Sequence, residues 1–81
     1  MGKIWLVYIL ECCDGSFYTG VTNDLDHRMK IHASGNGSKY VSRKGFKKLL
    51  FSKECKSHSD ACKAEYKIKK LSKWKKLDWF N

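Results

Sequence analysis

Apolar and polar residues follow a strand period in some parts of the chain and a helix period in others. Residues 4–10 form an apolar and aromatic run of strand length, and residues 17–21 form a second. The turn-forming residues 13–16 between them predict a β-hairpin. Residues 46–53 carry another apolar run and predict a third strand.

Two other segments carry helix signals. An N-cap at Asn23, acids in the first turn and glycines at the end predict a helix over residues 24–34. Ser57 and Asp60 resemble a capping box that opens a second helix, which runs at least to Leu71. After a break, residues 74–77 predict a short further helix. The glycine-punctuated basic segment before the third strand predicts a loop.

The predicted order is therefore strand, strand, helix, strand, helix, with a short further C-terminal helix. No strand-helix-strand repeat is present to build a parallel sheet. We expect an α+β fold, a small three-stranded antiparallel sheet flanked by helices. A chain of 81 residues holds one core, so residues 1–81 predict a single domain.

The charge of the chain indicates its partner. Seventeen Lys and Arg against eight Asp and Glu give a formal charge of +9, on a chain that is 42% apolar. A folded domain with this excess attracts polyanions, of which nucleic acid is the commonest. No apolar run approaches the roughly 18 residues of a membrane span, and no signal peptide is evident. We expect a soluble, cytoplasmic, nucleic-acid-binding protein that does not act at a membrane.

The four cysteines fit neither a disulfide framework nor a zinc module. Cys12 and Cys13 are adjacent, and the spacing from Cys55 to Cys62 lacks the paired C-x2-C hooks of common zinc sites. We expect free thiols.

The first helix places polar side chains beside its apolar stripe. At 100° per residue, Leu25, Arg28, Met29 and His32 share one side. Basic residues at the flank of a stripe often snorkel to water, which is the structural interpretation. The other interpretation is a site at the edge of the core.

The second helix repeats this pattern with the opposite charge. Glu65 lies beside the stripe of Ala61, Ala64 and Ile68. A buried carboxylate requires a cation or a metal ion, whereas an exposed one would pair with Lys69 at i, i+4. Both interpretations stay open at this point.

Tyr8 and Tyr18 lie in the otherwise apolar runs of the hairpin. A two-residue Asp14-Gly15 turn would place them on opposite faces of the sheet. A three-residue loop over residues 13–15 with a glycine bulge would pair Tyr8 with Gly20, and both phenols would share one face.

Taken together, Leu6-Val7-Tyr8, Tyr18-Thr19-Gly20, Arg28, His32 and Glu65 resemble the motif set of the GIY-YIG nuclease superfamily. Residues 24–28 and 38–43 resemble its small single-domain bacterial branch, the UPF0213-like proteins. The resemblance covers the length of the chain. It implies a three-stranded antiparallel sheet with helices, and a divalent-metal-dependent endonuclease that hydrolyses phosphodiester bonds.

The resemblance also implies a role for each residue. Glu65 would bind one Mg²⁺ or Mn²⁺, and Arg28 would neutralise charge on the scissile phosphate. Tyr8 or Tyr18 would deprotonate the attacking water, and His32 would assist that tyrosine or hold the phosphate. Val7 and Gly20 would support the motif.

Three positions depart from the family pattern. Leu6 replaces the first motif glycine, and Thr19 replaces the middle isoleucine of the second tripeptide. Val21 stands where some relatives carry a lysine, so Lys39 or His32 would have to supply that positive charge.

The substrate is expected to be DNA rather than RNA, cut with low sequence preference or by structure. No DNA-reading domain is recognised, so we expect sequence selectivity to be low or to be supplied by a protein partner. The residues expected to bind nucleic acid are Lys39, Tyr40, Arg43, Lys44 and Lys69. Trp74, Trp79 and Phe80 are expected to close the core, with base stacking as the alternative.

Three hypotheses follow. The chain is a metal-dependent endonuclease, a catalytically inactive nucleic-acid-binding module on the same scaffold, or an interaction domain in which Arg28 and Glu65 form a buried ion pair. The first requires Tyr8, Tyr18, Arg28 and Glu65 to meet at one concave surface.

Overall fold

The structure, a computed structural model, describes residues 4–80 as one sheet with four helices. The elements are β1 (Trp5–Cys12), β2 (Phe17–Thr22), α1 (Leu25–Ala33), α2 (Lys39–Lys44), β3 (Phe46–Cys55), α3 (His58–Lys69) and α4 (Lys73–Trp79). The strands form an antiparallel sheet in the order β2-β1-β3, so β2 is an edge strand. The predicted α+β fold is confirmed.

The β1–β2 hairpin turns through a three-residue loop. Tyr8 pairs with Gly20 and Leu10 with Tyr18, and Cys12 N donates to Ser16 O across the base of the loop at 2.8 Å. Gly15 has a φ of +87°, a conformation that glycine adopts without steric cost. The register that places both tyrosines on one face is therefore the observed one.

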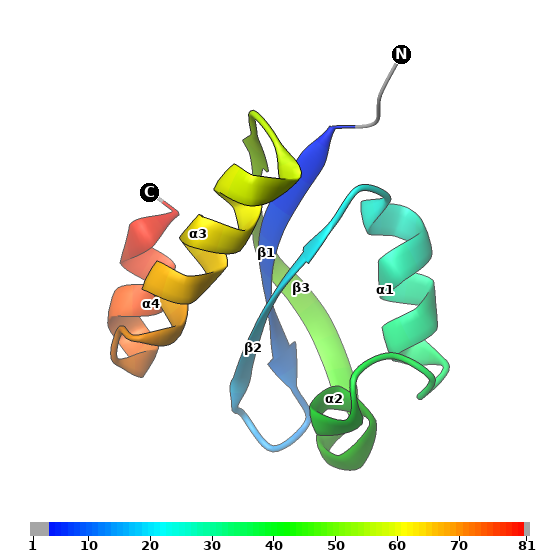
Figure 1. The fold of residues 1–81 in the computed structure, drawn as a ribbon. Coiled ribbons are helices and arrows are strands. Elements are labelled where there is room, and N and C mark those ends of the chain that lie inside the picture. The colour runs from blue at the N-terminus through cyan, green and yellow to red at the C-terminus, as the bar shows by residue number, and fades with distance from the viewer. Residues whose placement is uncertain (1–3, 81) are drawn as a thin grey trace.

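Helices cover both faces of the sheet (Figure 1), with α1 and α2 on one side and α3 and α4 on the other. Successive strand side chains point to opposite faces. Tyr8, Leu10 and Cys12 pack with Val41 of α2, whereas Val7 packs with Ala64 and Ile68 of α3. Each face of β1 thus has its own core.

Three local predictions were wrong. Helix α3 was expected to run at least to Leu71, but it ends at Lys69, with Lys70 as its C-cap. The segment expected to be a loop contains helix α2, whose N-cap Ser38 accepts a hydrogen bond from Val41 N at 3.1 Å. Only Val41 of this six-residue helix is buried, so the sequence has no periodic apolar stripe that would predict the helix. The N-cap of α1 is Asp24 rather than Asn23, and its carboxylate accepts from His27 N.

The C-terminal aromatic residues divide into two groups. Trp79 and Phe80 pack against the core of Val7, Ala64 and Ile68, as expected. Trp74 is 68% exposed, so the expectation that it closes the core was wrong. Within residues 4–80, no helix combines the length and apolar character needed to cross a membrane.

Candidate active site

Tyr8 and His32 form a buried polar pair between β1 and α1. Tyr8 Oη and His32 Nε2 share a hydrogen bond of 2.9 Å, and the two side chains belong to residues only 1% and 2% exposed. Since buried polar groups require partners, the bond accounts for one hydroxyl and one ring nitrogen. The interpretation that His32 snorkels to water is wrong.

Burial shifts the pKa of both groups toward their neutral forms. Desolvation raises the pKa of the Tyr8 phenol above its ordinary value, partly opposed by the neighbouring Arg28 guanidinium. Desolvation lowers the pKa of His32, and the charge of Arg28 lowers it further. At neutral pH the pair is therefore an uncharged phenol bonded to an uncharged imidazole.

Arg28 lies one helical turn before His32 and brings a positive charge to this pair. Its side chain is half-buried, and its Nε is fully buried without a hydrogen-bond partner among the described residues. A buried, unpartnered donor on a charged group costs about 1–3 kcal/mol or more. An anion that reached this nitrogen would remove that cost.

Tyr18 continues the polar cluster toward solvent. Its ring centroid lies 6.5 Å from that of Tyr8 and 5.6 Å from that of His32. On its other side it stacks on Tyr40 of α2, with centroids 5.9 Å apart and planes at 28°. Tyr18 is only partly buried, so it connects the buried pair to the surface.

Glu65 reaches the cluster from α3. Its side chain is 25% exposed, and its negative charge contributes to the raised pKa of Tyr8. Lys69 Nζ lies 3.6 Å from Glu65 Oε2, the i, i+4 contact that the structural interpretation expected. Within residues 4–80 no ion pair joins Glu65 to Arg28, so the buried pair of the third hypothesis is not formed.

Two glycines leave room for the buried pair. A Cβ built on Gly20 would lie 2.5 Å from Tyr8 Oη, and one built on Gly37 would collide with His32 Nδ1. Nδ1 has no hydrogen-bond partner among the described residues. Gly37 was predicted only to end a helix, and nothing in the sequence pattern indicated its contact with His32.

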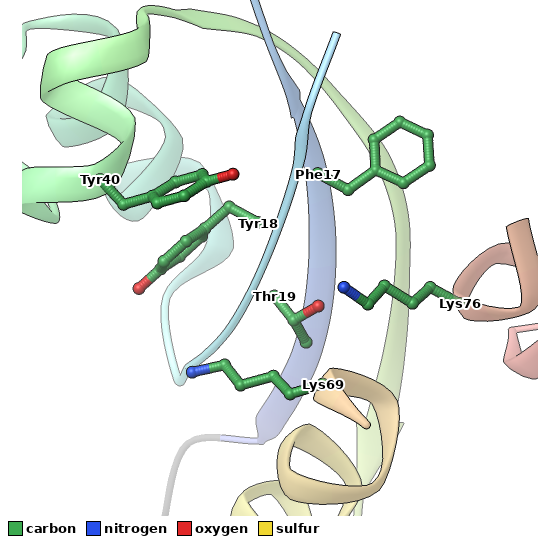
Figure 2. A pocket seen from close by; sticks show the side chains of 6 residues that line it. All are labelled: Phe17, Tyr18, Thr19, Tyr40, Lys69 and Lys76. Atoms are coloured by element: carbon green, nitrogen blue, oxygen red, sulfur yellow. The ribbon is translucent and has the colours of Figure 1, made fainter. Parts of the chain in front are cut away.

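A cavity of about 290 Å³ opens beside Tyr18. Figure 2 shows Tyr18 and Tyr40 on one side of β2 and two lysine side chains reaching toward the strand from α3 and α4. The lining residues are Phe17, Tyr18, Thr19, Tyr40, Lys69 and Lys76. Of the five residues expected to be catalytic, only Tyr18 lines this cavity. Arg28 and Glu65 act electrostatically on Tyr8, but neither they nor Tyr8 belong to the lining, so the expected meeting of Tyr8, Tyr18, Arg28 and Glu65 at one concave surface is not found at this cavity.

The residues predicted to bind nucleic acid fall into two groups. Tyr40 and Lys69 line the cavity. Lys44 is bound to Asp14 at 2.8 Å, while Lys39 and Arg43 are exposed on α2 outside the cavity lining. Sequence reasoning did not single out Lys76, Phe17 or Thr19 as site residues. No local sequence pattern indicated these three residues, because only the packing of α4 beside β2 brings them together.

The site has a single candidate metal ligand. Among the described residues, no group of three or more His, Cys, Asp or Glu side chains gathers as a metal site. Glu65 is an acidic residue close enough for its charge to raise the pKa of Tyr8. A metal held here would therefore take most of its ligands from water and from the bound anion.

Comparison with known proteins identifies this arrangement. A sequence model of the GIY-YIG catalytic domain matches residues 4–78, which include both tyrosines, Arg28, His32 and Glu65. The chain belongs to the GIY-YIG family. The resemblance inferred from the two tripeptides is thereby confirmed, and a GIY-YIG domain implies a nuclease class and a nucleic-acid substrate.

Relatives of this GIY-YIG domain span most of its length. A UPF0213 protein of Oceanobacillus iheyensis is 45% identical over 88% of this chain and 83% of its own. A UPF0213 protein of Halalkalibacterium halodurans is 50% identical over 86% of this chain and 74% of its own. The solution NMR structure of a UPF0213 protein from Bacillus halodurans matches the fold, with a TM-score of 0.57 and 46% identity, covering 95% of this chain and 82% of that one.

Proposed function

We propose that this GIY-YIG domain is a divalent-metal-dependent endonuclease that hydrolyses phosphodiester bonds in DNA. The observation that carries the proposal is the buried, unpartnered Nε of Arg28 beside the Tyr8–His32 pair. A planar guanidinium binds two oxygens of a phosphate, and a phosphate would satisfy the nitrogen that the protein leaves unpaired. The formal charge of +9 favours the same ligand.

Glu65 suits the metal that the family implies. Mg²⁺ and Mn²⁺ prefer oxygen ligands, and Mg²⁺ is commonly held by one or two carboxylates together with water and substrate phosphate. Glu65 is partly exposed, and its ion pair with Lys69 is a long contact of 3.6 Å. Once bound, such an ion would polarise the phosphate and stabilise the leaving oxygen.

The two tyrosines have different environments, which favours different roles. Tyr8 is buried, its pKa is raised, and its hydroxyl is bonded to His32, so it holds its proton at neutral pH. Tyr18 lines the open cavity, where Lys69 Nζ lies 5.9 Å from its ring centroid. We assign Tyr18 Oη to accept a proton from the attacking water, and the Tyr8–His32 pair to position Arg28 and the phosphate.

The second candidate is a nucleic-acid-binding module without turnover. The Glu65–Lys69 contact favours it, because a carboxylate that pairs within its own helix has a role without a metal. Under this candidate the chain binds DNA and cuts none.

Nicking of labelled DNA separates the two candidates. Single-stranded, duplex and branched DNA, with an RNA strand of the same sequence, are incubated with Mg²⁺, Mn²⁺ or EDTA. We expect metal-dependent nicking of DNA that falls at least about 100-fold in Glu65→Gln. Glu54→Gln, an exposed carboxylate on β3, is the matched control and should cleave normally.

Either of two results would contradict the nuclease. Cleavage that survives Glu65→Gln removes the metal role of Glu65, and tight binding without cleavage of any substrate supports the non-catalytic module.

The roles of the tyrosines are tested by conservative variants. Tyr18→Phe should abolish cleavage, since it removes the proton acceptor. Tyr8→Phe should retain cleavage at a lower rate, because it removes the hydrogen bonds that the Tyr8 hydroxyl makes with His32 and Arg28 but leaves Tyr18 in place. The reverse pattern would assign the base to Tyr8.

A further inference from the structure

The cavity beside Tyr18 lies along the edge strand β2, and its lining comes from four parts of the chain. We call it the β2-edge pocket: Phe17, Tyr18, Thr19, Tyr40, Lys69 and Lys76. Because β2 has a neighbour on one side only, the pocket opens where no other strand covers the sheet. The family motifs account for Tyr18 in this set and leave the purpose of the rest unexplained.

One wall of the pocket is aromatic. Tyr18 and Tyr40 stack with centroids 5.9 Å apart, and Tyr40 is 40% exposed, with Lys44 Nζ 5.2 Å from its ring centroid. Phe17 adds a third ring and contacts the exposed Trp74 edge-on at 5.9 Å. Exposed aromatic faces of this kind stack on nucleic-acid bases.

The opposite wall is cationic. Figure 2 shows the side chains of Lys69 and Lys76 extending toward β2, near Thr19. Among residues 4–80, the ion pair of Lys69 is the long contact with Glu65, and no acid pairs with Lys76. Lys69 Nζ lies 5.9 Å from the Tyr18 ring centroid, whereas Lys76 extends toward β2 from the side away from the tyrosines (Figure 2). Ammonium groups and phenol rings that line one pocket match the two parts of a nucleotide, a phosphate and a base.

The size of the pocket selects an unpaired nucleotide. About 290 Å³ is close to the lower limit of small-ligand sites, so the pocket accepts one nucleotide and not a double helix. In a duplex both faces of a base are covered by its stacked neighbours, so aromatic side chains reach only a base that has left the stack.

We propose that the β2-edge pocket binds one unpaired nucleotide of a DNA strand, with its base against Tyr40 and Tyr18 and its phosphate at Lys69 and Lys76. The proposal rests on the proposed function for the identity of the polymer. Since Tyr18 belongs to both the pocket and the candidate active site, the bound nucleotide adjoins the bond to be cut. Single strands, flaps and splayed ends are then preferred to intact duplex.

The test measures binding without cleavage. Fluorescence anisotropy in EDTA follows a labelled oligothymidylate and a blunt duplex at one salt concentration. We expect tighter binding of the single strand, a loss of about 10-fold in Tyr40→Ala on the single strand only, and normal binding in Tyr40→Phe. Lys76→Gln should weaken binding of the single strand and reduce the salt slope by roughly 0.7.

Matched controls exclude general effects of aromatic and basic residues. Tyr66 is 63% exposed on α3 and lies outside the pocket lining, so Tyr66→Ala should bind normally. Lys56, exposed between β3 and α3, gives the control Lys56→Gln. Circular dichroism checks each fold, and Lys76→Gln on α4 provides an answer if Tyr40→Ala disturbs α2.

Three results would overturn the pocket: equal affinity for single strand and duplex, equal losses on both in Tyr40→Ala, or displacement of the oligomer by an equal concentration of thymidine 5′-monophosphate. The last would assign the pocket to free nucleotides. Failure of the two proposals is distinguishable. Selective binding without cleavage under any metal contradicts the nuclease alone, whereas cleavage with a strand preference unchanged by Tyr40→Ala contradicts the pocket alone.

Discussion

The two faces of the sheet are built on different principles. The face under α3 buries Val7, Ala64 and Ile68, all apolar. The face under α1 buries a tyrosine hydroxyl and an imidazole, and it leaves Arg28 Nε without a partner among the described residues. Apolar burial stabilises the fold, whereas buried polar groups with incomplete pairing lower stability and are retained where a site needs them. Stability is therefore expected to come mainly from the face under α3, and the candidate chemistry lies on the face under α1.

The largest effect is expected on the apolar face. Ile68→Ala removes a fully buried side chain and should lower the free energy of unfolding by about 2–5 kcal/mol, through lost transfer energy and the cavity left behind. Urea denaturation measures it. Cleavage per folded molecule should be unchanged. A loss below about 1 kcal/mol would show that the α3 face is not the main source of stability.

The second test separates activity from stability on the polar face. Arg28→Met keeps an apolar stem but removes the guanidinium, whose buried Nε is without a partner among the described residues, so the free energy of unfolding should stay constant or rise. Cleavage should fall about 100-fold, which corresponds to ~2.7 kcal/mol in the barrier. Denaturation and nicking are measured on one preparation. A marked loss of stability would mean that Arg28 serves the fold.

A smaller effect is expected from the loop that covers His32. Gly37→Ala places a methyl group against His32 Nδ1 and should lower the free energy of unfolding by about 1–3 kcal/mol, because the ring must move away from Tyr8. The NMR signals of the His32 ring report the displacement. Asn36→Ala, in the same exposed loop, is the control. An unmoved ring would show that the loop gives way instead.

The smallest effect concerns pH. Burial lowers the pKa of His32 in the folded state, so the unfolded chain takes up a proton first as the pH falls. Stability is therefore constant above the ordinary histidine pKa of about 6.5 and decreases below it, by no more than ~1.4 kcal/mol per pH unit for one group. Denaturation at pH 7.5 and 5.5, compared with His32→Asn, measures this. An equal slope in the variant would assign it to other groups.

Much of the fold could be predicted because its elements carry strong local signals. The strands begin and end within two residues of their predicted bounds, and Ser57 caps α3 as its capping-box pattern indicated, accepting from Asp60 N at 3.1 Å. Helix α2 has one buried residue and a cap that a loop could also contain. Helix α2 contacts the core through Val41, and this contact depends on tertiary packing that a local sequence pattern does not indicate.

The candidate site shows the same limit. The placement of Arg28 and His32 on the stripe of α1 follows from helix geometry alone, and the shared face of Tyr8 and Tyr18 follows from the hairpin register. The contact of His32 with Tyr8 follows only from the packing of α1 on the sheet. The pocket does not follow from any local pattern. Tyr40 meets Tyr18, and Lys76 meets Thr19, only because α2 and α4 pack on opposite sides of β2.

Gly20 lies opposite Tyr8 on the neighbouring strand, and the Tyr8 side chain leaves no room for a side chain at position 20. A Cβ at that position would lie 2.5 Å from the Tyr8 hydroxyl. Substitutions at the two positions are therefore coupled, although the positions lie twelve apart in the sequence. Alanine at position 20 is acceptable only after position 8 has lost its aromatic ring, because Tyr8 Cζ would also lie 2.7 Å from the Cβ. In a relative that has lost either Tyr8 or Gly20, the constraint on the other position is removed. The two residues should therefore be gained and lost together.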